Sequence, residues 1–258
     1  MVVRPDSPTP PWQVNMSEVP LDSTELRDFA EAWRLAQQVP GWLTQAQAQA
    51  LWDAVHRLPS GSRVLEIGSH QGRSTTVLGI AARRVGATVV AVDPFIEGKL
   101  FGGTPTRKRF EQNISGAGLK GVVELIPDYS TKLRPNWDRP IDLLYIDGKH
   151  DYWTFTDDLL WSAHLPPGGE ILVHDSYSSI GVTSGILAKV LFGSRYSYQD
   201  RAGSMARFRA TAPRPADRRR VLAELPWFVR NVFIKVLLRL RLRPVARLVG
   251  HDSPYDPY

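Results

Sequence analysis

The sequence predicts an α/β fold in which a doubly wound, mainly parallel sheet of seven strands ends in an antiparallel hairpin. Short apolar segments that fit buried strands alternate with longer segments of helical period, which is the pattern of a parallel sheet covered on both faces. The first strand runs into a turn bracketed by glycines, and the second ends at an acidic residue. With 258 residues, the chain can form one large domain with appendages.

The N-terminal region is expected to contain an arm followed by two helices. Residues 1–21 include five prolines and show little periodicity, which predicts a flexible arm. A capping pattern that begins at Asp22 and one apolar face predict a helix to about Gln38. Thr44 and Gln47 form a second capping box, which predicts another helix after it.

The strands of the sheet follow from apolar runs between turn residues. The segment from Phe95 to Pro105 contains three glycines and is expected to be a loop, either a mobile rim of a binding pocket or a plain connector. The expected strands cover residues 62–67, 87–92, 122–127, 141–146 and 170–174, with 195–199 and 204–210 as the closing hairpin.

The turn after the first strand is the most informative local pattern. It reads Glu66-Ile67-Gly68-Ser69-His70-Gln71-Gly72, and Ser74 lies in the first turn of the helix that follows. Glycine lets the backbone bend sharply and approach a ligand, and the N–H groups at the start of the helix can bind a negative group. Because His70 replaces the second glycine of the dinucleotide-binding pattern G-x-G-x-x-G, the spacing is E-x-G-x-x-x-G instead.

Asp93 supplies the second half of this pattern, at the end of the second strand. An acid at that place in a nucleotide-binding sheet accepts hydrogen bonds from ribose hydroxyls. Asp93 therefore supports a Rossmann-like sheet but does not distinguish among nucleotide cofactors. The alternative is that Asp93 is an ordinary solvated acid at the end of a strand.

Two later strands deliver polar side chains to the same edge of the sheet. Asp147 ends one strand and His150 follows three residues later, while His174 and Asp175 end the next strand. Carboxylates suit Mg²⁺, and an imidazole with an ordinary pKa suits a catalytic base. The alternatives are aspartates that cap the following helices and histidines without a chemical task.

These residues carry a resemblance to known enzymes. The E-x-G-x-x-x-G turn resembles motif I of the class I S-adenosylmethionine (SAM) methyltransferases. The resemblance covers about Trp42 to Ala210, and a parallel sheet closed by an antiparallel hairpin is the methyltransferase form of the fold. The chain is also similar to the bacterial O-methyltransferase family that contains macrolide-sugar and other actinobacterial sugar methyltransferases, through Asp147-Gly148-Lys149-His150-Asp151-Tyr152, Asp158-Leu159, Pro167-Gly168-Gly169 and His174-Asp175.

The resemblance implies SAM as cofactor, Mg²⁺ or another divalent cation, and a saccharide acceptor such as a mannose or rhamnose unit. By position it makes Asp147 and Asp175 metal ligands, places His174 or Ser176 as alternatives beside them, and makes His150 the catalytic base, with Asp147 in the catalytic set. The cofactor contacts that it implies are Glu66, Gly68, Ser69, Gly72, Ser74, Asp93, Asp128 and Ser130.

Three other functions remain open at this point. Base-modifying N-methyltransferases carry an Asn/Asp-Pro-Pro-aromatic tetrapeptide where this chain has Asp147-Gly148-Lys149-His150, so a hydroxyl acceptor is favoured over an amine. A phenol or catechol could replace the sugar. A methyltransferase recruited to RNA and an NAD-dependent oxidoreductase are the remaining alternatives, the latter disfavoured by His70.

Composition and charge exclude several kinds of chemistry and partner. The chain has no cysteine, which excludes disulfides, thiolate catalysis and Cys-ligated zinc. The net charge of +6 comes from residues 211–258, where ten Lys or Arg face four Asp or Glu. The residues before 211 therefore have no net charge, which does not favour nucleic acid as a partner. With no secretory segment and no apolar run of membrane-spanning length, we expect a cytoplasmic protein.

The basic tail is expected to be helical and is the third part of the chain, after the arm (1–21) and a methyltransferase domain over 22–210. Residues 226–240 combine many apolar side chains with arginines. One interpretation is peripheral contact with the inner membrane face. The other is a helix packed on the body or on a second subunit of a homo-oligomer, which is favoured because apolar residues cover more than one face.

Overall fold

The computed structural model describes residues 23–98 and 102–253, so the arm predicted for residues 1–21 lies outside the described residues. The strands are β1 (Arg63–Ile67), β2 (Thr88–Val92), β3 (Val123–Ile126), β4 (Leu143–Ile146), β5 (Glu170–Val173), β6 (Ser197–Ala202) and β7 (Met205–Arg209). The helices are α1 (Ser23–Ala36), α2 (Gln45–His56), α3 (Arg73–Val85), α4 (Gly103–Gly116), α5 (Ser130–Leu133), α6 (Tyr152–Asp158), α7 (Ile180–Ile186), α8 (Pro215–Ala223), α9 (Leu225–Arg239) and α10 (Arg243–Leu248).

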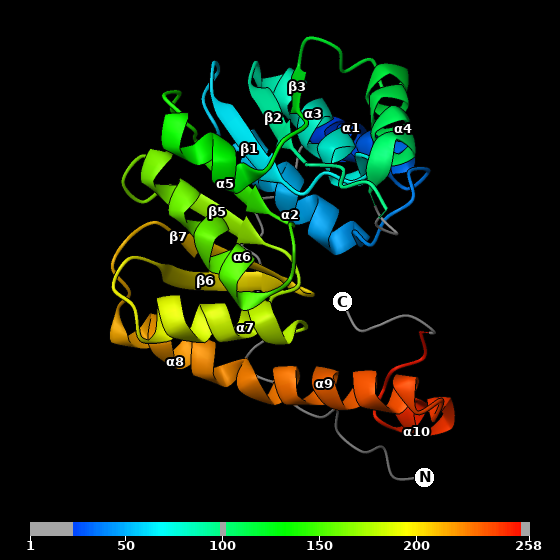
Figure 1. The fold of residues 1–258 in the computed structure, drawn as a ribbon, viewed down its shortest axis with the longest axis vertical. Helices are drawn as coiled ribbons and strands as arrows, with labels where there is room; N and C mark the ends of the chain where they lie inside the picture. The colour runs from blue at the N-terminus through cyan, green and yellow to red at the C-terminus, as the bar shows by residue number, and fades with distance from the viewer. Residues whose placement is uncertain (1–22, 99–101, 254–258) are drawn as a thin grey trace.

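The seven strands form one sheet in the order β3-β2-β1-β4-β5-β7-β6 (Figure 1). Strands β1 to β5 are parallel, and β7 runs antiparallel to both β5 and β6. The predicted doubly wound sheet with a terminal hairpin is therefore confirmed. The order reverses between β1 and β4, where open α/β sheets bind their ligands.

Each face of the sheet is covered by its own set of helices. Successive residues of a strand point to opposite faces, so Val64 joins the core under α1 to α4 while Leu65 joins the core under α6, α7 and α8. Because both faces are buried, the central strands are mainly apolar, with the buried Glu66 of β1 as an exception, and the sequence shows nearly continuous apolar runs.

Local sequence explains most helix boundaries. Thr44 and Gln47 form the predicted capping box of α2, and Gly72 precedes α3 in a left-handed conformation. One prediction was wrong in part, because residues 103–105 of the expected loop already belong to α4. Pro105 resembles a loop residue in sequence, yet in the first turn of a helix its missing N–H is not needed.

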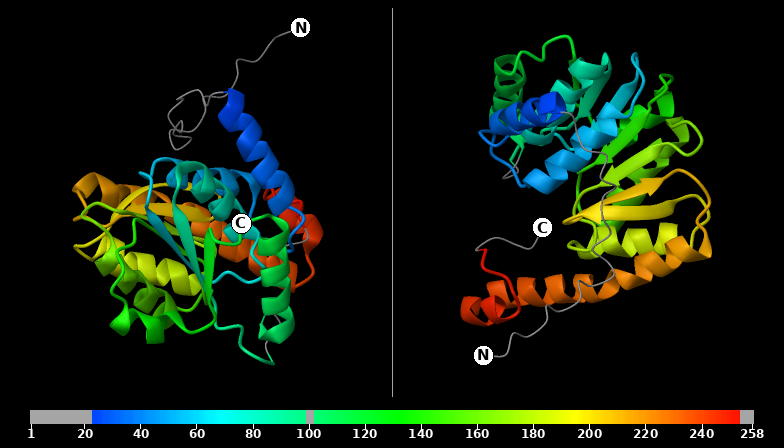
Figure 2. Two further views of the ribbon diagram at one scale, coloured as in Figure 1. Left: turned by 90° about the horizontal axis from the view of Figure 1, so that it is seen from above. Right: turned by 180° about the vertical axis from the view of Figure 1, so that it is seen from behind.

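The C-terminal tail continues directly from the hairpin. Glu224, between α8 and α9, accepts hydrogen bonds from Tyr198 on β6 at 2.8 Å and from Arg201 at 2.7 Å. Helix α9 then runs past the sheet, and α10 lies against its far end (Figures 1 and 2). Among the described residues, no helix is long and apolar enough to cross a membrane.

Candidate functional site

The turn after β1 lies against the end of β4, at the point where the strand order reverses. Gly68 has φ of +88° and sits so close to β4 that a Cβ atom there would lie 2.2 Å from the carbonyl oxygen of Asp147. Gly72 has φ of +90° and caps α3. The glycines that the motif predicted are therefore required, Gly68 by both backbone conformation and close approach.

Glu66 supports this turn from below. Its side chain is fully buried and accepts hydrogen bonds from the hydroxyl of Ser74, at 2.5 Å, and from that of Thr75. Burial raises the pKa of Glu66 to about 7, although both hydroxyls act to lower it. Glu66 and Ser74 thus face each other and join β1 to the first turn of α3, and their predicted contacts with a cofactor stay predictions.

Asp93 shapes the same turn from the end of β2. One carboxylate oxygen accepts the backbone N–H groups of Ser69 at 3.0 Å and His70 at 2.8 Å, and the other accepts that of Phe95 at 2.8 Å. His70 adopts φ of 47°, a left-handed conformation that is uncommon outside glycine. The sequence analysis did not predict that Asp93 would stabilise the turn. The signal for it was His70, because a non-glycine residue in a tight turn needs hydrogen bonds that stabilise its backbone.

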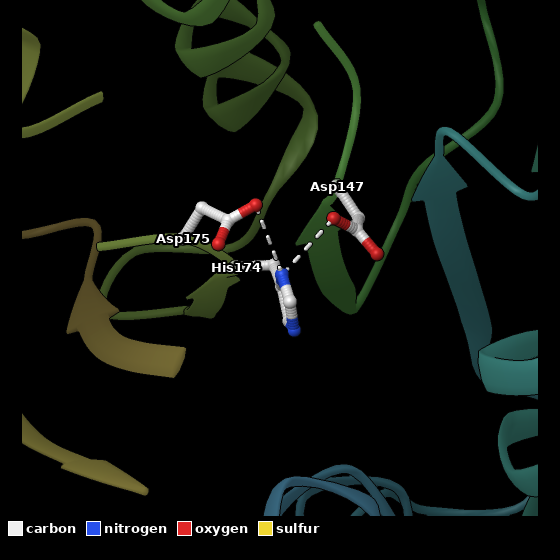
Figure 3. A group of neighbouring side chains, drawn as sticks. All are labelled: Asp147, His174 and Asp175. Carbon is white, nitrogen blue, oxygen red and sulfur yellow. Dashed lines mark ion pairs between the residues drawn. The ribbon is translucent and has the colours of Figure 1, made fainter. Parts of the chain in front are cut away.

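A cluster of ionisable side chains follows β4 and β5 (Figure 3). The register pairs Ile146 with Val173, so Asp147 and His174 come next to each other at the edge of the sheet. The Nδ1 atom of His174 lies 3.3 Å from an oxygen of Asp147 and 3.5 Å from an oxygen of Asp175. One potential ligand atom from each of the three residues lies within 4.8 Å of the others, so they could share a metal ion.

Residues far away in the chain position His174. Its Nε2 atom lies 3.3 Å from the side-chain oxygen of Gln47 on α2, and the amide of Gln47 donates to the hydroxyl of Ser204 at 3.0 Å. Burial acts to lower the pKa of His174, but the carboxylates of Asp147 and Asp175 outweigh it and raise that pKa to about 9. Sequence reasoning assigned Gln47 to helix capping alone and had no signal for Ser204.

The loop after Asp175 adopts an unusual backbone conformation. Asp175 and Tyr177 both have positive φ, 54° and 57°. Each costs on the order of 1 to 3 kcal/mol and persists only where neighbours fix it. Ser178 donates to a carboxylate oxygen of Asp175 at 2.9 Å, and Asn231 on α9 donates to the carbonyl oxygen of Tyr177 at 3.2 Å.

His150 lies on the open side of the cluster. Its Nδ1 atom is 3.0 Å from an oxygen of Asp175, and its Nε2 atom is 3.7 Å from an oxygen of Asp147. Its side chain is 47% exposed, whereas that of His174 is 3% exposed. Burial acts to lower the pKa of His150, but the two carboxylates raise it above its ordinary value. Of the two imidazoles, only that of His150 is open to an incoming acceptor.

Asp128 and Ser130, the two cofactor contacts predicted after β3, differ from each other in burial. The hydroxyl of Ser130 is buried and donates to Asp158 on α6 at 2.6 Å. Burial raises the pKa of Asp158 to about 7. Asp128 is partly exposed, accepts the N–H of Tyr129 at 2.7 Å and lies 3.6 Å from Lys132. The structure thus engages Ser130 with α6 and leaves Asp128 at the surface, and their predicted contacts with a cofactor stay predictions.

A family model described as a methyltransferase domain matches residues 65–176. This stretch begins in β1 and ends just after Asp175, so it contains both the glycine turn and the ionisable cluster. The similarity to a methyltransferase domain thus extends over residues 65–176. The predicted enzyme class is therefore confirmed at this level, and the match gives no support to an NAD-dependent oxidoreductase.

Solved structures share the fold of the domain. The SAH-bound methyltransferase PaMTH1 from Podospora anserina superposes with a TM-score of 0.56 at 15% identity, over 71% of this chain and 87% of that one. The O-methyltransferase from Bacillus cereus in complex with SAH gives 0.51 at 19% identity, over 76% and 93%. Cofactor-bound Rv0187 from MTB gives 0.53 at 18%, over 75% and 93%. At these identities the likeness confirms the Rossmann-like methyltransferase fold.

Proposed function

We propose that this protein is a SAM-dependent O-methyltransferase that uses a divalent cation and methylates a hydroxyl of a saccharide. The observation that carries the proposal is the convergence of Asp147, His150 and Asp175 at the carboxyl ends of β4 and β5, against the Gly68 turn. This edge of the sheet is where the fold binds its ligands.

The glycine turn supports SAM as the cofactor. The backbone at Gly68 can approach the amino-acid end of the molecule without a Cβ atom, and the ribose would lie towards Asp93. Three of the roughly four acceptor positions of the Asp93 carboxylate already receive backbone N–H groups, which leaves about one for a ribose hydroxyl. The solved relatives in complex with SAH occupy the same fold.

Asp147 and Asp175, with His174 beside them, fit a divalent cation. Two carboxylates and one imidazole are a donor set used for Mg²⁺, Mn²⁺ and related ions. The carboxylates already stabilise a positive charge between them, because they raise the pKa of His174 to about 9 against the effect of burial. A bound cation would lower the pKa of a coordinated hydroxyl group of the acceptor.

His150 would act as the base. Its Nδ1 atom lies 3.0 Å from Asp175, whereas Nε2 is 3.7 Å from Asp147, beyond hydrogen-bonding distance, so Nε2 would be the atom that accepts the acceptor's hydroxyl proton. Bound SAM would supply the methyl group, because the deprotonated oxygen would form a bond to its methyl carbon while the carbon–sulfur bond breaks, giving the methyl ether and SAH. The charged imidazole that results is stabilised by Asp175 and Asp147.

The acceptor class rests on the resemblance and on one feature of the surface. Trp42 is exposed, and its ring centroid lies 5.7 Å from that of His70 in the glycine turn. An exposed indole can stack on a sugar ring, but it would stack on a phenol equally well. A phenolic or catechol-like acceptor is therefore the second candidate.

A screen of SAM consumption tests the proposal. The protein is incubated with Mg²⁺ and with sugars, glycolipids, phenols or RNA, with and without a chelator, beside an Asp147→Ala variant. We expect methylation of a saccharide that the chelator and the variant abolish, with binding of SAH by calorimetry unchanged. Full activity in chelator would refute the metal site, activity on phenols alone would refute the acceptor class, and affinity for NAD without affinity for SAH would refute the whole proposal.

A further inference from the structure

The C-terminal helices expose a series of large apolar side chains, here called the stripe. On α9 and its C-cap it consists of Val229, Phe233, Val236 and Leu240, which are between 47% and 64% exposed. Their spacing of four, three and four residues places them on one narrow face of the helix. It also includes Leu242, at the N-cap of α10, and Val245 and Leu248 on α10, the last of which is 86% exposed.

The opposite face of α9 already packs on the protein. Ile234 and Leu237 are buried, and Asn231 is fully buried where it bonds to the loop after Asp175. The side chain of Arg230 donates to the carbonyl oxygens of Val249 and Gly250, which ties the end of α10 to α9. The exposed stripe is therefore not the side that α9 uses to join the body, and single scattered apolar residues do not account for it.

The charge of this segment is entirely positive. Residues 225–250 contain six Lys or Arg and no Asp or Glu. Four of the arginines are exposed around the turn and α10, namely Arg239, Arg241, Arg243 and Arg247, and the last lies 3.8 Å from Asp252. An apolar stripe bordered by arginines is the pattern of a helix that lies in a membrane interface and contacts anionic headgroups.

Two other partners fit this surface less well. A symmetric dimer through the stripe would bring the same segment of a second copy against it, and with it six further positive charges and no acidic residue to pair with them. RNA would satisfy the arginines, but it offers phosphates and bases and would leave the six aliphatic side chains of the stripe in water.

We propose that α9 and α10 bind the surface of an anionic lipid membrane through the stripe formed by Val229, Phe233, Val236, Leu240, Leu242, Val245 and Leu248. The arginines contact the lipid headgroups and the stripe lies at the level of the upper acyl chains. Asn231 on the inner face of α9 remains bonded to the carbonyl oxygen of Tyr177, so the bound helix is joined to the loop that carries Asp175.

Vesicle sedimentation with the full chain tests the proposal. The probes are vesicles of phosphatidylcholine alone and vesicles with about one quarter phosphatidylglycerol, each at low and high salt. We expect binding to the anionic vesicles, at least about tenfold weaker binding to the neutral ones, and weakening by salt. The same samples are examined by light scattering for dimers and by gel shift with RNA.

Two variants separate the apolar and the basic contribution. Replacing the α9 part of the stripe (V229Q, F233Q, V236Q and L240Q) keeps residues that favour helices and should weaken vesicle binding by about tenfold or more. Removing three arginines (R239Q, R241Q and R243Q) should weaken it severalfold and reduce its salt dependence. The matched controls remove exposed apolar residues elsewhere (L160Q and F192Q) or three other exposed cations (R107Q, K108Q and K120Q) and should bind like the native protein.

Helix content and melting temperature of each variant show whether it folds. With folded variants, failure of the native protein to bind anionic vesicles would overturn the proposal. A dimer that the stripe variant dissolves, without vesicle binding, would assign the stripe to a second copy instead. Binding of RNA that only the arginine variant loses, again without vesicle binding, would assign the surface to nucleic acid. Loss of vesicle binding in the controls would equally contradict a role for the stripe.

Discussion

His150 and His174 lie beside the same two carboxylates but differ in access to solvent. His174 is buried between Asp147 and Asp175 and is contacted from behind by Gln47. His150 is half exposed and has one ring nitrogen directed at Asp175. We therefore propose that His174 supports or binds a cation and that His150 transfers the proton.

The first residue-scale prediction concerns His150→Ala. If Nε2 of His150 accepts the hydroxyl proton, this change should lower kcat by roughly two to four orders of magnitude, with little effect on the affinity for SAH or for the cation. Turnover and calorimetry on the same preparation give both numbers. His164→Ala is the control, because His164 lies away from the cluster: its backbone carbonyl accepts the N–H of Ile141 near the opposite end of β4. Unchanged turnover would move the base role to another residue.

The second residue-scale prediction concerns Gln47→Ala. Gln47 orients His174, so its removal should weaken binding of the divalent cation by about 10 to 100-fold while SAH binding persists. Titration with Mn²⁺ or Mg²⁺ measures the effect. Gln49→Ala serves as the matched control on the same helix, because Gln49 pairs with Asp53 outside the cluster. Equal cation affinity in both variants would show that Gln47 has no part in positioning His174.

At the scale of elements, the turn between β1 and α3 depends on a glycine for two separate reasons. Gly68 and Gly61 have similar φ, +88° and +85°, but a Cβ atom on Gly68 would collide with β4 while one on Gly61 meets open space. We expect Gly61→Ala to lower the free energy of unfolding by about 1 to 2 kcal/mol from backbone strain alone.

Gly68→Ala should cost several kcal/mol more than that, on the order of 3 to 5 kcal/mol in total, and should abolish SAH binding because the turn must move away from β4. Urea denaturation of the two variants isolates the collision, since the strain is common to both. Equal stability of the two variants would mean that β1 and β4 can separate at this point without cost.

At the scale of the whole molecule, a buried acid links folding to pH. Burial raises the pKa of Asp158 to about 7 from its ordinary value of 3.8. Between these values the folded state binds more protons than the unfolded state, so the contribution of Asp158 to stability is favourable below this window and is lost as pH rises through it. The free energy of unfolding should fall by on the order of 2 to 4 kcal/mol from this group between about pH 4 and pH 8.

Asp158→Asn should remove this fall, because the amide can still accept the hydrogen bond of Ser130 and carries no charge at any pH. Urea denaturation of both proteins at pH 5 and pH 8 measures the difference in slope. Glu66, whose pKa burial also raises to about 7, contributes in the same direction and is present in both proteins. Parallel pH dependence of the two proteins would contradict a neutral, buried Asp158.

The sequence alone determined the class of fold and the edge of the sheet at which the site lies. The evidence for both is local, so it can be recognised in the sequence without the tertiary structure. It consists of strand periodicity, the spacing of Gly68 and Gly72, and the acids at strand ends. The seven strands lie within a few residues of their expected positions. The start of α4 was misplaced because Pro105 is compatible with both a loop and a first helical turn.

Only the tertiary structure showed which of the candidate site residues contact one another. Gln47 meets His174 across 127 residues of chain and Ser204 across 157, and no local pattern encodes such contacts. The exposed stripe of α9 was likewise invisible in sequence, because its apolar residues surround the helix and only packing on one side shows which face remains open. Local periodicity fixes which residues share an element, whereas the register of the sheet and the docking of distant elements fix which side chains meet and which stay in water.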